Sequence, residues 1–529
     1  MGNLSENVHV FIYKRKNNSG SISIIVLKKQ RRSNKVVSYV GTANNEYELE
    51  YLIRVAKKRI SNIQGEQLSI FDNQTAAAKL HGFLKRFIPK HAIRVGYYEV
   101  FGKVFDELQL NDLVKSSLFK NLIIARIAKP NSKLSTARWL NDKLQVKTNS
   151  DQIYRLMDEI DYLTQRQINN HLYQYVKDYL NDEIHVIFFD ATTLHFETFE
   201  TDSFRSLGYS KVGKHNQPQI VVGLMVTREG LPLGYEVFPG NKWDGHTIVS
   251  ALTRVKRRSG VNRVVFVADA GMSTEKNIAL IEEFGYEFIL ADKLKSRSDQ
   301  IKEYVLDPKN YNDQDICEMV IGARNHKLIS HYSEDRARKD RVDRENVIER
   351  TRKKISRKNR ITKSVIRAPK YFDLIGQSNL VLNREKVRND QRWDGIKGYR
   401  TNIEDLPAID IIARYHDLWQ VERAFKVTKQ DLGIRPIHHR KRDRIRAHIF
   451  LVFVSLVVSR MVELKVKDIK LTTARMLEHL DSVQENIFKD SITKEEFRFR
   501  PELGEINKGI YERLNIPYQV GIQDLEREV

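Results

Sequence analysis

The sequence predicts a mixed α/β protein whose central sheet domain is interrupted by an insertion. Between residues 184 and 292, short apolar strand-like runs alternate with helical patterns, which is typical of a sheet covered by helices. Residues 296–390 break this pattern with a strongly basic stretch, and the pattern resumes near Trp393. A basic β-hairpin and helix precede the α/β region, and a charged tail that we expect to be helical follows it.

The composition indicates a globular protein with a polyanionic partner. The chain has 529 residues, of which 41% are hydrophobic and 30% charged, and its net charge is +22. Such a positive charge favours nucleic acid, because Lys and Arg side chains release counterions from phosphates. The longest apolar run, residues 449–458, is about half of the ~20 residues that span a membrane, so we expect no membrane association. Without a signal-peptide pattern, and with Cys317 as its single cysteine, the chain is expected to be cytoplasmic and nucleoid-associated.

The chain is expected to have five regions. Residues 1–74 alternate in hydrophobicity around a turn and then become helical, which predicts a basic β-hairpin and helix. Apolar residues at steps of three and four predict a helical DNA-binding region over residues 75–183, and a purely structural bundle fits the same pattern. The other regions are an α/β domain (184–295 and 391–462), a basic insertion domain (296–390) and a C-terminal helical tail (463–529).

Two aspartates end strand-like runs in the α/β region. Asp190 closes IHVIFFD, and Asp269 closes RVVFVAD. At a strand end a carboxylate can leave the core without burying an unpaired charge. A strand-end Asp is also the nucleophile of some phosphatases, but these carry a second Asp two residues on, where this chain has Thr192. We therefore interpret both aspartates as ligands of a hard cation, which prefers oxygen.

A third carboxylate, Glu422, lies on a predicted helix over Ala413–Lys429. Spacing places it on the same face as several apolar side chains, so we expect it to be buried and to need a cation or a metal. The alternative is an ordinary amphipathic helix on which Glu422 pairs with Lys429 or Arg423 at the surface. The residues of the shared face are Tyr415, Leu418, Glu422, Phe425 and Lys429.

Together these motifs resemble the DDE transposases of bacterial insertion sequences, in the branch with a Tyr–Arg–Glu–Lys signature. The signature is spaced Y-x2-R-x3-E-x6-K. Tyr415, Glu422 and Lys429 match it, and Leu418 stands in place of the Arg. The resemblance covers roughly residues 90–460. Further matches are Asp190 with Thr192 and Thr193, PGNKWDGHT at 239–247, VADAGM at 267–272 and DGIKG at 394–398.

The resemblance implies a ribonuclease H-like catalytic domain in which Asp190, Asp269 and Glu422 bind two Mg²⁺ or Mn²⁺ ions. The enzyme would nick double-stranded DNA at the ends of its element and join the freed 3′-hydroxyls to target DNA. It would act as a homodimer that holds both ends in a synaptic complex.

Four residues are expected to contact DNA by the same resemblance: Tyr415, Lys429, Trp393 and Arg423. Tyr415 and Lys429 would bind terminal phosphates, Arg423 or Arg414 would replace the signature Arg, and Trp393 would stack on a flipped base. Core packing is the other explanation for Tyr415 and Trp393. Two other functions stay open, namely a catalytically inactive, sequence-specific DNA-binding protein derived from a transposase, and a ribonuclease H-like nuclease without strand transfer.

Overall fold

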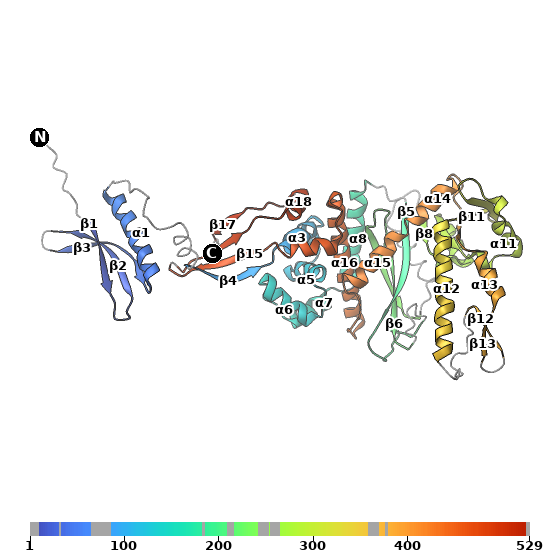
Figure 1. Ribbon diagram of the computed structural model, residues 1–529, viewed down its shortest axis with the longest axis horizontal. Coiled ribbons are helices and arrows are strands. Elements are labelled where there is room, and N and C mark those ends of the chain that lie inside the picture. Colours follow the sequence, from blue (N-terminus) through green and yellow to red (C-terminus); the bar gives the residue numbers. More distant parts are fainter. Residues whose placement is uncertain are drawn as a thin grey trace. The chain divides into compact units, whose positions relative to one another are not determined.

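The chain forms two compact units in the computed structural model (Figure 1). Unit 1 comprises residues 1–93, 484–502 and 518–529, and unit 2 comprises residues 94–483 and 503–517. The C-terminal segment therefore contributes to both units. The structure describes residues 10–30, 33–64, 86–181, 186–208, 216–241, 253, 265–357, 370–375, 379–492 and 494–524.

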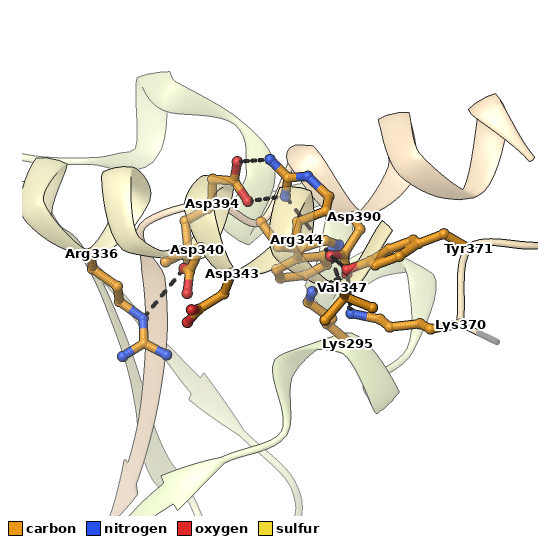
Figure 2. A pocket seen from close by; sticks show the side chains of 12 residues that line it. Lys295, Arg336, Asp340, Asp343, Arg344, Val347, Lys370, Tyr371, Asp390 and Asp394 are labelled. Carbon is orange, nitrogen blue, oxygen red and sulfur yellow. Dashed lines mark hydrogen bonds and ion pairs between the residues drawn. The ribbon is translucent and has the colours of Figure 1, made fainter. Parts of the chain in front are cut away.

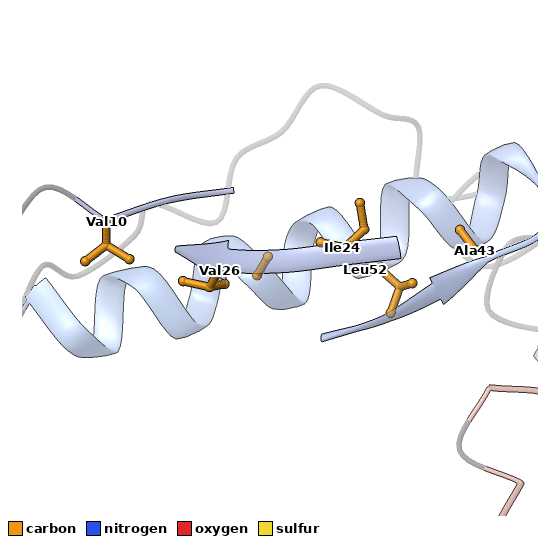
Figure 3. Packing of buried hydrophobic residues seen from close by; sticks show 6 residues of the cluster. Val10, Ile24, Val26, Ala43 and Leu52 are labelled. Atoms are coloured by element: carbon orange, nitrogen blue, oxygen red, sulfur yellow. The ribbon is translucent and has the colours of Figure 1, made fainter. Parts of the chain in front are cut away.

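The first part of unit 1 is a three-stranded antiparallel sheet covered by a helix. Strands β1 (Val10–Lys16), β2 (Ile22–Lys29) and β3 (Asn34–Ala43) are ordered β1-β2-β3, and α1 (Glu46–Gln64) packs on one face. Alternation along the strands turns one set of apolar side chains toward α1. The small core between sheet and helix consists of Val10, Ile24, Val26, Ala43, Leu52 and Ala56 (Figure 3).

The second part of unit 1 is a four-stranded sheet that the sequence did not predict. Its order is β17-β16-β15-β4, and β4 pairs with β15, so that Ile93 lies opposite Glu485, 392 residues later (485 − 93). The prediction of an all-helical tail over 463–529 was therefore wrong, and the region over 75–183 includes a strand. These strands are short, and their partners are distant in sequence, so local periodicity does not reveal them. Their bounds are β4 Phe87–Ile93, β15 Glu485–Asp490, β16 Glu496–Arg500 and β17 Gly521–Asp524.

Unit 2 contains a layer of helices that follow the predicted helical periodicity. Local caps set several of their ends: Ser132 accepts a hydrogen bond from the Ser135 amide, and Asn149 forms a capping box with Gln152. These helices are α3 (Gly96–Glu107), α4 (Leu110–Leu113), α5 (Ser117–Ala128), α6 (Lys133–Leu144), α7 (Ser150–Glu159) and α8 (Tyr162–Tyr179). Two helices of the tail join them, α17 (Thr473–Leu480) and α18 (Glu505–Arg513).

Helix α16 (Arg442–Lys465) is the core of unit 2. It contacts α3, α5, α7 and α8 on the helical side and β7 (Pro232–Pro239) and α15 (Trp419–Gln430) on the sheet side (Figure 1). Among the described residues it is the one helix long and apolar enough to cross a membrane, and its most apolar window is 94% buried inside the protein. A helix that is apolar all round and packed on both sides is the expected centre of a layered domain.

The large sheet of unit 2 has eight strands in the order β10-β11-β14-β9-β8-β5-β6-β7. The central strands β5, β8 and β9 run parallel, and the other neighbours are antiparallel. Because β5 is covered on both sides, its sequence is almost continuously apolar. The remaining bounds are β5 Val186–His195, β6 Gln219–Val226, β8 Val265–Ala268, β9 Glu287–Asp292, β10 Ile316–Ile321, β11 His326–Tyr332 and β14 Ile396–Thr401.

The expected insertion over 296–390 is only partly separate from this sheet. Strands β10 and β11 lie within those residues, yet β11 pairs with β14 and extends the sheet. Outside the sheet the region forms α11 (Asp299–Leu306), the basic helix α12 (Glu334–Arg357), the hairpin β12 (Phe372–Ile375) with β13 (Asn379–Leu382), and α13 (Arg384–Gln391). Helix α10 (Glu275–Glu283) follows β8. The sequence also predicts a basic helix over residues 247–258, and these residues lie outside the described part of the chain apart from residue 253.

Candidate active site

Two of the predicted carboxylates lie on neighbouring parallel strands. Strand β5 pairs with β8 so that Phe188 lies opposite Val267, and the same register continued by two residues brings Asp190 beside Asp269. Asp190 is half-buried in the middle of β5, which continues to His195, so its expected position at a strand end was wrong. Asp269 is exposed directly after β8, as expected. The Oδ1 atom of each accepts a 2.7 Å hydrogen bond from the amide of its own following residue. The sheet therefore fixes two backbones that can present carboxylates at one edge.

The helix predicted over Ala413–Lys429 is two helices. Helix α14 spans Ala408–His416, and α15 begins at Trp419. Between them the chain tightens, because the Leu418 amide donates to the Tyr415 carbonyl (3.0 Å) and the Val421 amide to the Leu418 carbonyl (3.1 Å), each three residues back. No Gly or Pro marks this break in the sequence, which is why periodicity predicted one continuous helix.

The predicted burial of Glu422 was also wrong. Tyr415, Leu418 and Phe425 are 4–5% exposed, as expected for the apolar face, whereas Glu422 is exposed. The tightened turn changes the angular spacing along the segment, so Glu422 no longer shares the face of Tyr415. Glu422 nevertheless stands on α15, which packs on β5 and β6. Within the described part of the chain it forms no ion pair, so the alternative surface pair is not observed either.

Lys397 on β14 is a cation that sequence reasoning missed. Its Nζ lies 4.2 Å from the centroid of the Tyr415 ring and 5.6 Å from that of Tyr399. Burial lowers the pKa of Lys397, whereas the carboxylates of Asp269 and Glu422 raise it. Burial raises the pKa of Tyr415, and the same two carboxylates raise it further. Asp269 and Glu422 are thus both within electrostatic reach of the half-buried Lys397 and of the Tyr415 ring beneath it.

Arg336 adds a second cation from the basic helix α12. Burial is the main cause of the lowered pKa of Lys397, and the charge of Arg336 lowers it further. The Nε atom of Arg336 lies 3.7 Å from Asp340 Oδ2. The sequence motif DGIKG contains Lys397, but nothing in the sequence distinguishes Arg336 from its many basic neighbours on α12. Helix α12 of the insertion therefore contributes a positive charge, Arg336, close to the candidate site.

A cavity of about 280 Å³ lies beside Arg336, between α12, α13 and the start of β14 (Figure 2). Asp390 accepts hydrogen bonds there from Lys295 (2.6 Å), Tyr371 (2.7 Å) and Lys370 (3.1 Å). Burial raises the pKa of Asp390, but these donors outweigh it and lower the pKa to about 2. Arg344 binds Asp394 through two 2.6 Å hydrogen bonds. These ion pairs hold the insertion against the sheet.

The four predicted DNA-binding residues occupy different environments. Trp393 lines this cavity and packs half-buried against a cluster that includes Leu294 and Leu328. Tyr415 is in the core under Lys397. Arg423 donates to Glu463 Oε2 (2.9 Å), and Lys429 is half-buried with its Nζ 5.2 Å from the Phe425 ring centroid. Arg423 is therefore part of an internal ion pair, and Trp393 borders the cavity beside Arg336.

The carboxylates fit a hard divalent cation by the chemistry of their oxygen atoms. Asp190 and Asp269 also fit by position, because adjacent strands carry them. As the side chains stand, no three His, Cys, Asp or Glu residues among those described are gathered closely enough to hold a metal ion. One oxygen of Asp190 and one of Asp269 accept a hydrogen bond from the following backbone amide, and Glu422 is exposed on α15.

Residues 182–458 match the protein family described as Transposase DDE domain. This match covers more than half of the chain. The chain belongs to that family. The expectation of a DDE transposase is thereby confirmed, while the Tyr–Arg–Glu–Lys branch and the origin in a bacterial insertion sequence stay predictions. No curated protein matches the chain.

Two solved transposase complexes are similar to this family member over part of their length. The piggyBac transposase synaptic complex with hairpin DNA is 9% identical, with 73% of this chain and 76% of that chain covered and a TM-score of 0.37. The Mos1 transposase paired-end complex with left transposon end is 11% identical, with 45% and 66% covered and a TM-score of 0.15.

Proposed function

We propose that the chain is a transposase that nicks double-stranded DNA at the ends of its element and joins the freed 3′-hydroxyls to target DNA. Asp190, Asp269 and Glu422 would hold two Mg²⁺ or Mn²⁺ ions in a ribonuclease H-like domain. One observation supports this proposal beyond family membership: the charges of Asp269, which follows the register of Asp190, and of Glu422 both raise the pKa of the half-buried Lys397.

The residues of the site would have two roles in phosphoryl transfer, namely metal binding and phosphate binding. Two bound divalent ions would activate a water or a 3′-hydroxyl and stabilise the leaving oxygen. The parallel strands keep Asp190 and Asp269 in fixed relation, and α15 brings Glu422 over β5. Lys397 and Arg336 supply positive charge where a DNA phosphate would approach, which is the role that the missing signature Arg leaves open at Leu418.

The partner proposed is double-stranded DNA, both element ends and target. A net charge of +22 and the basic helix α12 support this, because phosphate contacts dominate the affinity of DNA-binding proteins. Lys429 and Trp393 remain proposed DNA contacts, Tyr415 would act through Lys397, and Arg423 would have to leave Glu463 to bind DNA. We further propose a homodimer in the synaptic complex and a cytoplasmic, nucleoid-associated location.

The test is Mg²⁺-dependent nicking of a duplex that carries a cognate element end. We expect Asp190→Asn, Asp269→Asn and Glu422→Gln each to abolish nicking, because removal of one ligand disables the whole unit. Asp299→Asn, at an exposed carboxylate of α11, is the matched control and should keep wild-type activity. Wild-type nicking by any of the three site variants would contradict the proposed site.

The products separate the proposed function from its two alternatives. A transposase gives a joined product when both ends and a target are supplied. Cutting without joining would instead indicate a ribonuclease H-like nuclease. Tight, sequence-specific binding without any cutting would indicate a DNA-binding protein derived from a transposase.

A further inference from the structure

Two basic side chains in the helical layer of unit 2 are buried without a counterion. The exposed fraction is 6% for Arg126 and 5% for Lys133. Within the described part of the chain, neither the guanidinium nor the ammonium group forms a hydrogen bond or an ion pair. Burying one charge without a partner is costly, and burying two like charges together is more so.

Both cations lie at the turn between α5 and α6. Arg126 is in the last turn of α5, and Lys133 is the first residue of α6. The segment that joins α15 to α16 packs on this turn: a Cβ on Gly433 would stand 3.0 Å from Pro130 Cβ and 3.7 Å from Arg126 Nη1. Gly433 has a φ of +56°, so both the conformation and the close approach favour glycine there.

Two histidines extend the cluster. His448 of α16 is buried and its Nε2 lies 3.1 Å from the carbonyl oxygen of Ile434, next to Gly433. Its other ring nitrogen, Nδ1, is buried without a hydrogen-bond partner. The ring of His439 lies 5.4 Å from that of His448, centroid to centroid. The turn, the joining segment and α16 therefore bring four basic side chains to one place.

The charges around the cluster are almost all positive. Burial lowers the pKa of Arg126 to about 10. The pKa of Lys133 is lowered mainly by burial and further by the charge of Arg126. The pKa of His439 is lowered to about 4, mainly by burial and further by the charges of Lys133 and Arg444. The nearby Asp158 is held by Arg444 through two 2.6 Å hydrogen bonds. No carboxylate among the described residues is thus committed to Arg126 or Lys133.

We propose that Arg126, Lys133 and His439 form a binding site for a phosphate group. The guanidinium offers several donors in one plane, the ammonium adds a point charge, and the ring of His439 can donate one N–H, whereas His448 donates its N–H to the Ile434 carbonyl. The N-terminus of the twelve-residue helix α6 points its backbone donors to the same turn. The phosphate belongs either to a DNA backbone or to free inorganic phosphate, and only the first source rests on the proposed function.

Thermal unfolding of the full-length protein tests the site with inorganic phosphate, compared with chloride at equal ionic strength and without divalent metal. We expect phosphate to raise the wild-type midpoint by a few degrees, because it binds the folded state alone. Lys133→Met should lose this rise without a loss of stability in chloride. Lys133→Arg and the exposed control Lys129→Met should keep it. Equal midpoints in phosphate and chloride, or a full rise in Lys133→Met, would overturn the inorganic source.

Fluorescence anisotropy with a labelled duplex in EDTA tests the DNA source. If a backbone phosphate occupies the site, Lys133→Met and Arg126→Met should each weaken binding and lower the salt slope by about one for a single lost phosphate contact. A phosphate-specific midpoint rise with unchanged DNA binding would assign the site to inorganic phosphate. No midpoint rise together with unchanged DNA affinity would refute the proposal. Because neither assay needs cleavage, an inactive carboxylate site would leave both results unaffected.

Discussion

At the scale of single residues, the charge balance around Lys397 links the carboxylates to the rest of the protein. Its ammonium group lies over the Tyr415 ring, and the negative charges of Asp269 and Glu422 both raise its pKa. A cation in that position reduces the electrostatic repulsion between the two carboxylates, and it offers positive charge to a phosphate. The aromatic floor restricts where this ammonium group can go.

Replacing Lys397 tests this role. We expect Lys397→Met to lower the rate of nicking about 10–100-fold, because a charged hydrogen bond to a phosphate contributes about 1.5–3 kcal/mol. Lys397→Arg should retain part of the activity. Lys295→Met, which removes a lysine from the neighbouring cavity, is the control and should affect stability more than nicking. Equal nicking by Lys397→Met and wild type would rule out a contact with the reacting phosphate.

The low pKa of Asp390 makes a prediction about acid stability. Its folded pKa of about 2 lies below the ordinary value near ~3.9, so ionised Asp390 stabilises the fold by about 2 kcal/mol at neutral pH. This stabilisation is present above about pH 4 and is lost as the pH falls through about 2. Denaturant unfolding between pH 2 and 7 should show Asp390→Asn less stable at pH 7 and similar to wild type near pH 2. A constant difference over the whole range would contradict this assignment.

The two aspartates that follow apolar runs were predictable from the sequence, whereas the continuation of β5 beyond Asp190 and the surroundings of both side chains were not. Asp190 and Asp269 stand out in the sequence because each closes an apolar run. The exposure of Glu422 depends on a tightened turn at Leu418 that has no sequence marker. Lys397 and Arg336 become visible only when β14 and α12 are placed beside the strand ends, since both lie among many other basic residues.

At the scale of elements, the position of α15 depends on one buried carboxylate of α16. Glu463 accepts hydrogen bonds from Arg423 of α15 (2.9 Å) and from the amide of Thr473 at the start of α17 (2.7 Å), and it is paired with Arg460. Arg460 in turn donates to the carbonyl of Gly230 in the turn between β6 and β7 (3.1 Å). This network ties α15 and the sheet edge to the central helix.

Glu463→Ala should therefore destabilise the protein by about 3–5 kcal/mol, because it leaves buried Arg460 without its partner. It should also reduce nicking, since α15 carries Glu422. Denaturant unfolding measures the first effect and the end-nicking assay the second. Glu478→Ala, which removes an exposed ion pair with Arg475, should change stability by less than about 1 kcal/mol. A similar small effect at Glu463 would show that the network does not hold α15.

Elements with strong local signals were predictable from periodicity. The apolar helix α16 and the covered strands β5 and β8 follow directly from the distribution of apolar residues. The sheet that joins β4 to β15 was not predictable, because its strands are short and half-exposed and because β4 and β15 are separated by about three quarters of the chain. The same limit explains why β10 and β11 were assigned to an insertion rather than to the large sheet.

At the scale of the whole molecule, the candidate site is assembled from segments far apart in sequence. Strands β5 and β8 carry two carboxylates, α15 brings the third after the insertion, and β14 returns from the insertion with Lys397. The family match over residues 182–458 spans all of these segments. The insertion is therefore part of the site as well as a long connection, since α12 supplies Arg336.

Iron-directed cleavage of the backbone tests most directly whether the three carboxylates share a metal site. Fe²⁺ replaces Mg²⁺ in the protein bound to an element-end duplex, and hydroxyl radicals generated with ascorbate and peroxide cut the chain near the bound metal. We predict cuts near residues 190, 269 and 422 together, all suppressed by excess Mg²⁺ and by Asp190→Asn. Cuts near residues 190 and 269 with none near 422, or cuts that persist in Asp190→Asn, would contradict the three-carboxylate site.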